Sequence, residues 1–150
     1  MVVQPGNITV INDCYNCNPN ALNAMVDTLA SMPANRRIVV AGEMLELGPE
    51  GEELHRGCGR HIAEKAIDVL LGVRGLAAAT VEAARQAGMR AEFVATPEEA
   101  GGWLARETRD GDVVLLKASR GVKLEKALDT WKQRSAAPGV ANDQRLTTND

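Results

Sequence analysis

Residues 112–121 read DVVLLKASRG, and this stretch decides the fold. Its apolar side chains occupy consecutive positions instead of alternating, as expected for a strand that is covered on both faces. Four other segments have a similar β-rich character. The five predicted strands are ITVIN from Ile8, RIVVAG from Arg37, IDVLLG from Ile67, AEFVA from Ala91 and DVVLLKA from Asp112.

Helical patterns separate these strands. The first is an apolar stripe at i, i+3, i+4 and i+7, and it begins at Pro19 with Asn18 as its predicted N-cap. Thr96 and Glu99 form a predicted capping box for a later helix. The remaining helices are predicted over 52–65, over 76–86 with a stop near Gly88, and after Gly121.

Strands that alternate with helices indicate βαβ units. The predicted fold is therefore an α/β, three-layer Rossmann-like domain with a mostly parallel, doubly wound sheet. This domain is expected over residues 1–134, and the polar, aperiodic residues 135–150 are expected to form a disordered tail. Ligands of such sheets bind at the carboxyl ends of the strands.

Composition excludes several partners. A net charge of -3, a pI near 5.5 and 3% aromatic residues argue against nucleic acid. The sequence has neither a signal-peptide pattern at its start nor a run of 18 apolar residues, so we expect a soluble, cytoplasmic protein with no membrane partner. It also contains no G-x-x-x-x-G-K-[ST] phosphate loop.

Polar side chains follow the first predicted strand, in NDCYNCNP. An aspartate can accept ribose hydroxyls, an asparagine can pair with both donor and acceptor edges of a purine, and a tyrosine offers a flat face. The same residue types also form turns and caps without any ligand. The candidate residues are Asp13, Tyr15, Asn16 and Asn18.

The last strand ends in Lys117, Ser119 and Arg120. Two cations and a hydroxyl at a predicted helix start favour a carboxylate or phosphate site, because exposed backbone amides point the same way. Helix stability alone would not select cations there, since they oppose the helix dipole. Glu43 and Glu46 follow the second strand and could act as a paired acid and base, or could be solvated loop residues.

The thiols of Cys14 and Cys17 have the spacing of a redox dithiol. A zinc site could draw on His55 and Cys58 in addition, but His61 falls off their helix face and only one good ligand pair exists. The favoured interpretation is that all three cysteines pack as small apolar residues. No metal is therefore predicted in this chain.

Four segments together resemble the carboxy-terminal domain of the Mur ligases, in order and in spacing. They are DCYNCNP at 13–19, AGEMLELG at 41–48, His55, and LLKASRGVKLE at 115–125. The family usually has D-S-Y-N-A-N-P in the first motif and K-G-S-R-G in the last. Cys14 and Cys17 therefore stand where Ser and Ala are common, and Ala118 replaces a glycine.

The resemblance implies a part of an ATP-dependent amide ligase of peptidoglycan synthesis, specifically one that adds D-alanyl-D-alanine. In such enzymes ATP with Mg²⁺ phosphorylates a carboxylate of a UDP-N-acetylmuramoyl-tripeptide, which the dipeptide amine then attacks. Central and amino-terminal domains, which these 150 residues do not include, supply the phosphate loop and the uridine-nucleotide site. The 150 residues alone are therefore expected to be inactive.

The resemblance also assigns roles to individual residues. It directs Asp13, Tyr15, Asn16 and Asn18 toward the ribose and adenine, and Lys117, Ser119 and Arg120 toward the dipeptide and the transferred charge. Two alternatives remain open: a stand-alone Rossmann-like nucleotide-binding module, and a Cys-x-x-Cys redox or zinc protein.

Overall fold

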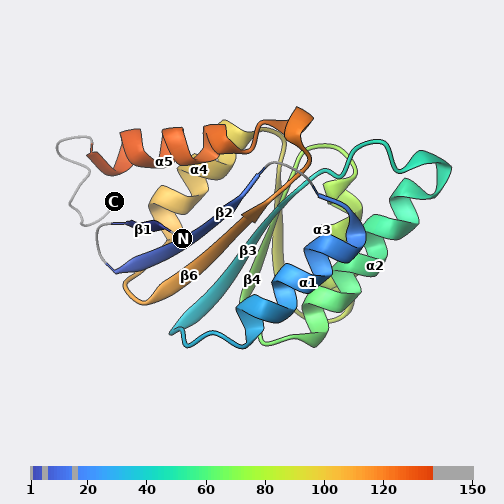
Figure 1. Cartoon of the computed structure of the whole chain (residues 1–150), viewed down its shortest axis with the longest axis horizontal. Coiled ribbons are helices and arrows are strands. Elements are labelled where there is room, and N and C mark those ends of the chain that lie inside the picture. Colours follow the sequence, from blue (N-terminus) through green and yellow to red (C-terminus); the bar gives the residue numbers. More distant parts are fainter. Residues whose placement is uncertain (1, 5–6, 15–16, 137–150) are drawn as a thin grey trace.

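A computed structural model describes residues 2–4, 7–14 and 17–136 (Figure 1). Its strands within that part of the chain are β1 (Val2–Gln4), β2 (Ile8–Asp13), β3 (Arg36–Gly42), β4 (Val69–Val73), β5 (Arg90–Val94) and β6 (Asp112–Lys117). Its α-helices there are α1 (Pro19–Ala30), α2 (Gly51–Glu64), α3 (Ala77–Gln86), α4 (Pro97–Glu107) and α5 (Glu125–Ala136). The 3-10 turns η1 (Gly48–Glu50) and η2 (Arg120–Val122) precede α2 and α5.

The strands form one sheet in the order β1-β2-β6-β3-β4-β5. All neighbours are parallel except β1, which pairs antiparallel with β2. The prediction of a mostly parallel three-layer α/β fold is confirmed. The edge strand β1 was not predicted, because its three residues are too short to carry a periodic pattern.

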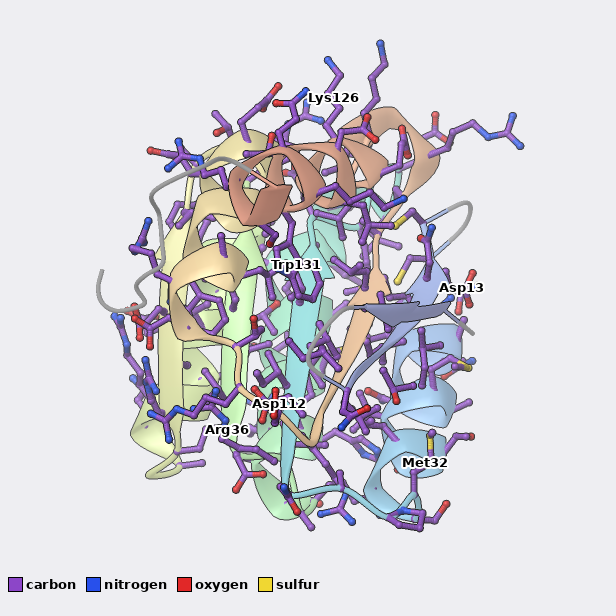
Figure 2. All side chains as sticks on the ribbon, turned by 90° about the vertical axis from the view of Figure 1, so that its left-hand side faces the viewer. Asp13, Met32, Arg36, Asp112, Lys126 and Trp131 are labelled. Atoms are coloured by element: carbon purple, nitrogen blue, oxygen red, sulfur yellow. The ribbon has the colours of Figure 1, made fainter. Side chains whose placement is uncertain are left out.

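Helices cover both faces of the sheet (Figure 1). The core on one face is built with α4 and α5, where Trp131 packs between helix and sheet (Figure 2). The core on the other face is built with α1, α2 and α3. Central strands β4 and β6 are buried at every position, which agrees with their unbroken apolar runs.

The predicted helix signals are confirmed with one correction. Asn18 caps α1, and Thr96 with Glu99 forms the capping box of α4. The last helix does not follow Gly121 directly; it begins at Glu125, after η2 and Lys123 in the left-handed region at φ 58°. At its far end α5 includes residues 135–136 of the predicted tail, and residues 137–150 lie outside the described part.

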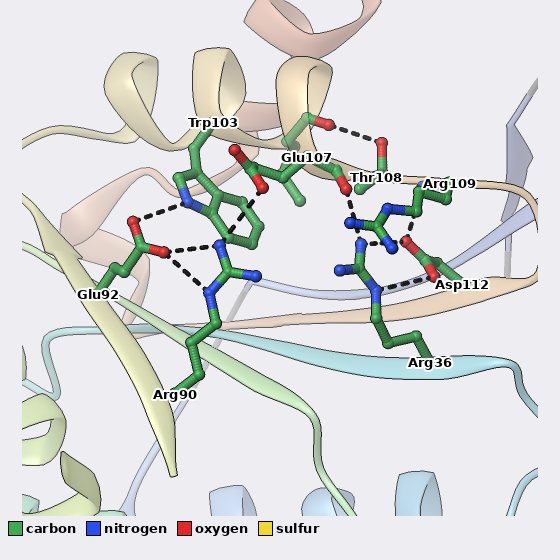
Figure 3. Close-up of polar contacts among 9 residues, drawn as sticks. Arg36, Arg90, Glu92, Trp103, Glu107, Thr108, Arg109 and Asp112 are labelled. Atoms are coloured by element: carbon green, nitrogen blue, oxygen red, sulfur yellow. Dashed lines mark hydrogen bonds and ion pairs between the residues drawn. The ribbon is translucent and has the colours of Figure 1, made fainter.

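The amino end of the sheet is closed by a buried ion pair. Arg36 contacts Asp112 at 2.9 Å, and the Asp112 side chain is 2% exposed. Arg36 also donates to the Glu107 carbonyl at 2.6 Å, and Asp112 accepts the Arg109 amide at 2.8 Å (Figure 3). This network lies at the opposite end of β6 from Lys117, so it fixes the sheet without entering the carboxyl edge.

No helix among the described residues is long and apolar enough to span a bilayer.

Candidate functional site

Three loops meet at the carboxyl edge of the sheet, because β2, β6 and β3 are neighbours. Asp13 ends β2 and lies opposite Lys117 of β6, which in turn lies opposite Ala41 of β3. We call the segments that follow these strands the β2–α1, β6–α5 and β3–α2 loops. Strand order therefore brings together two groups of residues that lie about a hundred positions apart in the sequence.

Lys117 and Asp13 form the polar centre of this edge. The Lys117 ammonium donates to Oδ2 of Asp13 at 2.7 Å, and the lysine side chain is only 3% exposed. The Asp13 side chain is 39% exposed. The structure thus joins a residue predicted to contact nucleotide to one predicted to contact dipeptide, and leaves the aspartate as the member that solvent reaches.

Ser119 lies in the same edge but is turned inward. Its hydroxyl accepts the Leu45 backbone amide at 2.9 Å and donates to the Cys17 carbonyl at 3.5 Å. The residue is 9% exposed. Both contacts are to backbone atoms of the two neighbouring loops.

Arg120 is exposed and lines a pocket of about 260 Å³ with Asn12, Cys14 and Glu125. The pocket lies between the end of β2 and the start of α5, on the sheet face that α5 covers. The helical turn that directly follows β6 is η2, which begins at Arg120, whereas α5 begins only at Glu125. Of these three predicted residues, Arg120 is the exposed one.

Asn18 is engaged as the N-cap of α1, where its Oδ1 accepts the Ala21 amide at 2.8 Å. The sequence was compatible with either a capping role or a ligand-binding role for Asn18, and the structure shows the cap. Tyr15 and Asn16 lie outside the described residues.

Glu43 does not form a catalytic pair with Glu46 through any described contact. Its Oε2 accepts the Leu76 amide at 3.0 Å, and its other oxygen lies 3.6 Å from Arg74. Glu46 is exposed, and its φ of 62° marks the turn of the loop. Glu43 is therefore a link between the β3–α2 loop and the segment after β4.

Arg74 is a residue that the sequence reasoning missed. It follows β4, has φ 73°, and donates to the Gly121 carbonyl at 3.2 Å. A left-handed arginine costs roughly 1–2 kcal/mol, so the surrounding contacts must hold it. No periodicity marks it; the Arg-Gly pair after a buried strand was the only available signal.

His55 of α2 holds the β3–α2 loop through hydrogen bonds of its ring. The ring is fully buried, its Nε2 accepts the Met44 amide at 2.9 Å, and its Nδ1 lies 2.6 Å from the Gly51 carbonyl. An amide donor at Nε2 leaves the ring proton on Nδ1, which donates to Gly51. His55 therefore has a structural role: it connects α2 to the β3–α2 loop.

The cysteines do not support a dithiol or a zinc site. Cys14 belongs to the core on the α5 face and Cys17 to the core on the α1 face. Burial raises the pKa of Cys14 to about 12, that of Cys17 to about 11 and that of Cys58 to about 12. A reactive thiol needs the opposite shift. Within the described ranges, no three His, Cys, Asp or Glu side chains are grouped to hold a metal ion.

Comparison with known proteins identifies the family of this chain. The model of the Mur ligase glutamate ligase domain matches residues 1–120. The chain belongs to the Mur ligase family. A curated relative from Bacillus subtilis, named UDP-N-acetylmuramoyl-tripeptide–D-alanyl-D-alanine ligase, is 31% identical over 121 residues, which are 79% of this chain and 26% of the relative.

Solved structures agree with this Mur ligase assignment. The MurF ligase of Thermotoga maritima in complex with ADP aligns with a TM-score of 0.72 and 25% identity, over 88% of this chain and 29% of that one. MurF from Acinetobacter baumannii aligns with a TM-score of 0.76 and 26% identity, over 87% and 29%. The Mur ligase domain described here therefore spans less than a third of the length of these relatives.

The departures from the usual Mur ligase motifs have structural explanations. Ala118 is fully buried, and its methyl group belongs to the core on the α5 face. Gly42 faces it so closely that a Cβ there would lie 2.5 Å from the Ala118 Cβ. The additional methyl group therefore points into the protein, against a glycine, and not toward the solvent-facing edge.

Proposed function

We propose that this chain acts as the carboxy-terminal domain of an ATP-dependent ligase. The ligase adds D-alanyl-D-alanine to a UDP-N-acetylmuramoyl-tripeptide in the cytoplasmic stage of peptidoglycan synthesis. One observation carries the proposal: the motif residues Asp13, Lys117 and Arg120 gather at one edge of the sheet, in a chain whose curated relatives are named for that reaction.

The nucleotide side of the proposal rests on the end of β2. Asp13 is accessible, and its carboxylate is held by the buried Lys117 ammonium, so it can accept a ribose hydroxyl from the exposed side. Tyr15 and Asn16 follow after Cys14 and would provide the flat face and the amide edge for adenine. The helix cap made by Asn18 fixes where this loop ends.

The dipeptide side rests on Arg120. A guanidinium can bind a carboxylate through two parallel hydrogen bonds, and this one opens onto a pocket large enough for a small ligand. Glu125 also lines this pocket and carries the charge that suits an ammonium group. A dipeptide carries both a carboxylate and an ammonium group. Its amine must leave the pocket in order to attack the phosphorylated carboxylate of the other substrate.

The described residues do not fit a Mg²⁺ site of their own, since they contain no group of three candidate ligands. Mg²⁺ and the phosphates of ATP would be held by the parts of the ligase that carry the phosphate loop. When bound, they supply the charge neutralisation that phosphoryl transfer needs. This domain's own contribution is to orient the nucleoside and the dipeptide and to exclude water as it closes.

Titration of the 150-residue chain tests the proposal, by following amide NMR signals with ADP and with D-alanyl-D-alanine in separate samples. We expect ADP to shift residues 13–18 and the dipeptide to shift residues 117–121, at millimolar concentration. We also expect no phosphate release by the chain alone. Zinc shifts at Cys14, Cys17 and His55, with both other ligands silent, would overturn the proposal in favour of a metal site.

Activity is tested in a chimera. The chain replaces the matched region of the Bacillus subtilis relative, and phosphate release is measured with all substrates. Ligase activity in the chimera supports the proposal. A folded chimera that binds the UDP-linked tripeptide but shows no turnover contradicts it.

A further inference from the structure

Ser119 stands between the two loops on which the proposed function depends. A serine hydroxyl has one proton to donate and two lone pairs to accept with. In Ser119 the proton is directed at the Cys17 carbonyl of the β2–α1 loop, and one lone pair takes the Leu45 amide of the β3–α2 loop. At 9% exposure, little of the residue is left for a ligand.

We propose that Ser119 is a positioning residue that couples the β2–α1 loop to the β3–α2 loop, and not a contact for the dipeptide. The inference rests on the proposed function only for its consequence on ligand binding. The coupling itself concerns three segments of this chain, and it can be measured with no ligand present.

Each of the two contacts of Ser119 lies beside a rigid anchor. Met44, next to Leu45, is tied to the buried ring of His55 at 2.9 Å. Asn18, next to Cys17, caps α1 through the Ala21 amide at 2.8 Å. Ser119 thus bridges two points that are one residue from fixed structure. Loss of the bridge would be transmitted to the cap of α1 on one side and to the clamp by His55 on the other.

The two hydrogen bonds of Ser119 differ in length and therefore in strength. The bond from Leu45 has the ordinary length of an N–H···O bond, whereas 3.5 Å is long for a hydroxyl donor. Ser119 therefore bonds Leu45 more strongly than it bonds Cys17. A ligand bound to the β2–α1 loop could shorten the hydrogen bond between Ser119 and the Cys17 carbonyl. The Ser119 hydroxyl would stay in place because Leu45 already bonds it.

The experiment compares Ser119→Ala with Ser31→Ala, by amide hydrogen exchange on the whole 150-residue chain. Ser31 is a matched control because its hydroxyl also bonds a backbone carbonyl, that of Thr28 at 2.8 Å, at the exposed end of α1 far from the loops. Ser119→Thr keeps the hydroxyl and tests rescue. Exchange of a central β3 amide, Val39, reports any global loss of stability.

We expect Ser119→Ala to accelerate exchange at Leu45 by tenfold or more and at Ala21 by several-fold, with Val39 unchanged. Ser31→Ala and Ser119→Thr should leave Leu45 as in the parent chain. We also expect Ser119→Ala to weaken ADP binding several-fold. Acceleration at Leu45 without any change at Ala21 would overturn the coupling, because Ser119 would then hold one loop only.

Two further outcomes separate this inference from the proposed function. If the parent chain binds no ADP, the nucleotide side of the proposed function fails, while the exchange rates at Leu45 and Ala21 still decide the coupling. If Ser119→Ala loses D-alanyl-D-alanine binding with both exchange rates unchanged, Ser119 is a substrate contact and the inference is wrong. Should Ser119→Ala not fold, Ser119→Cys, with its weaker donor, provides the same comparison.

Discussion

The Lys117 ammonium lies 2.7 Å from Oδ2 of Asp13, across a parallel strand pair in which the two residues are register partners. The lysine is buried and the aspartate is partly exposed. A buried ammonium is costly unless it is paired, so Asp13 has a structural duty in addition to any contact with a ligand. The same carboxylate that faces the proposed nucleotide site therefore holds the sheet edge together.

Asp13→Asn should lower the free energy of unfolding by about 2 kcal/mol, because the buried Lys117 ammonium loses the negative charge that lies 2.7 Å away. This is less than the roughly 3–5 kcal/mol for a fully buried pair, since solvent reaches the 39% exposed aspartate. Urea unfolding of the chain measures the change. Asp129→Asn, on the exposed face of α5, is the control and should be neutral within about 0.5 kcal/mol.

His55→Ala should cost about 3 kcal/mol in unfolding free energy, because it leaves a cavity and a buried Met44 amide without its acceptor. The sequence has one other histidine, His61, whose ring pairs with the exposed Asp27 at 2.7 Å. His61→Ala should therefore change stability by less than about 1 kcal/mol. Equal losses in the two variants, by urea unfolding, would contradict the role assigned to His55.

The three thiols should make stability fall at alkaline pH. Burial raises the pKa of each in the folded chain, to about 12 for Cys14, about 11 for Cys17 and about 12 for Cys58, against 9.0 in the unfolded chain. Stability from this source is complete below pH 9 and is lost as pH rises from 9 toward 11 or 12. The loss is at most about 1.4 kcal/mol per pH unit for each thiol.

This pH dependence is measured by urea unfolding between pH 8 and pH 10.5, beside Cys58→Ala. The variant should be less stable at neutral pH, because it loses packing, but it should show a shallower alkaline slope. A parent chain whose stability is flat across that range would show that the thiols ionise freely in the folded state.

Arg120→Ala should remove binding of D-alanyl-D-alanine and leave the chain folded, because Arg120 is an exposed residue that lines the pocket. Arg120→Lys should restore only part of the affinity, since an ammonium cannot form the bidentate pair. Arg60→Ala, on the exposed face of α2, is the matched control. Calorimetric titration checks all three. Dipeptide affinity that is unchanged in Arg120→Ala would place the dipeptide elsewhere.

Gly42→Ala should cost about 1–3 kcal/mol, because its new methyl group meets that of Ala118. The double variant Gly42→Ala with Ala118→Gly moves the methyl group from one residue to the other and should recover at least about 1 kcal/mol of that loss. Additive effects in this double-mutant cycle, measured by thermal unfolding, would mean that the two residues are not in contact.

The helix signals could be predicted from local sequence because their physics is local. Asn18 and Thr96 each accept the amide three residues further on, and Pro19 and Pro97 suit a first helical turn. The short strand β1 could not be predicted, because its existence depends on pairing with β2. The late start of α5 depends on the packing of η2 against the end of β3, where Val122 lies beside Gly42, and local sequence does not indicate that packing.

The sequence by itself determined the parallel α/β fold and the segments that carry its chemistry, because unbroken apolar runs require burial on both faces and the order of motifs is a linear property. Only the tertiary structure decided which of those residues pair with each other, which are buried and which are exposed. Strand order places Lys117 against Asp13, and the segment after β6 buries Ser119 and leaves Arg120 exposed. The Lys117–Asp13 and Ser119–Leu45 contacts join residues 104 and 74 positions apart, and they depend on the register of β2, β6 and β3, which local sequence does not encode.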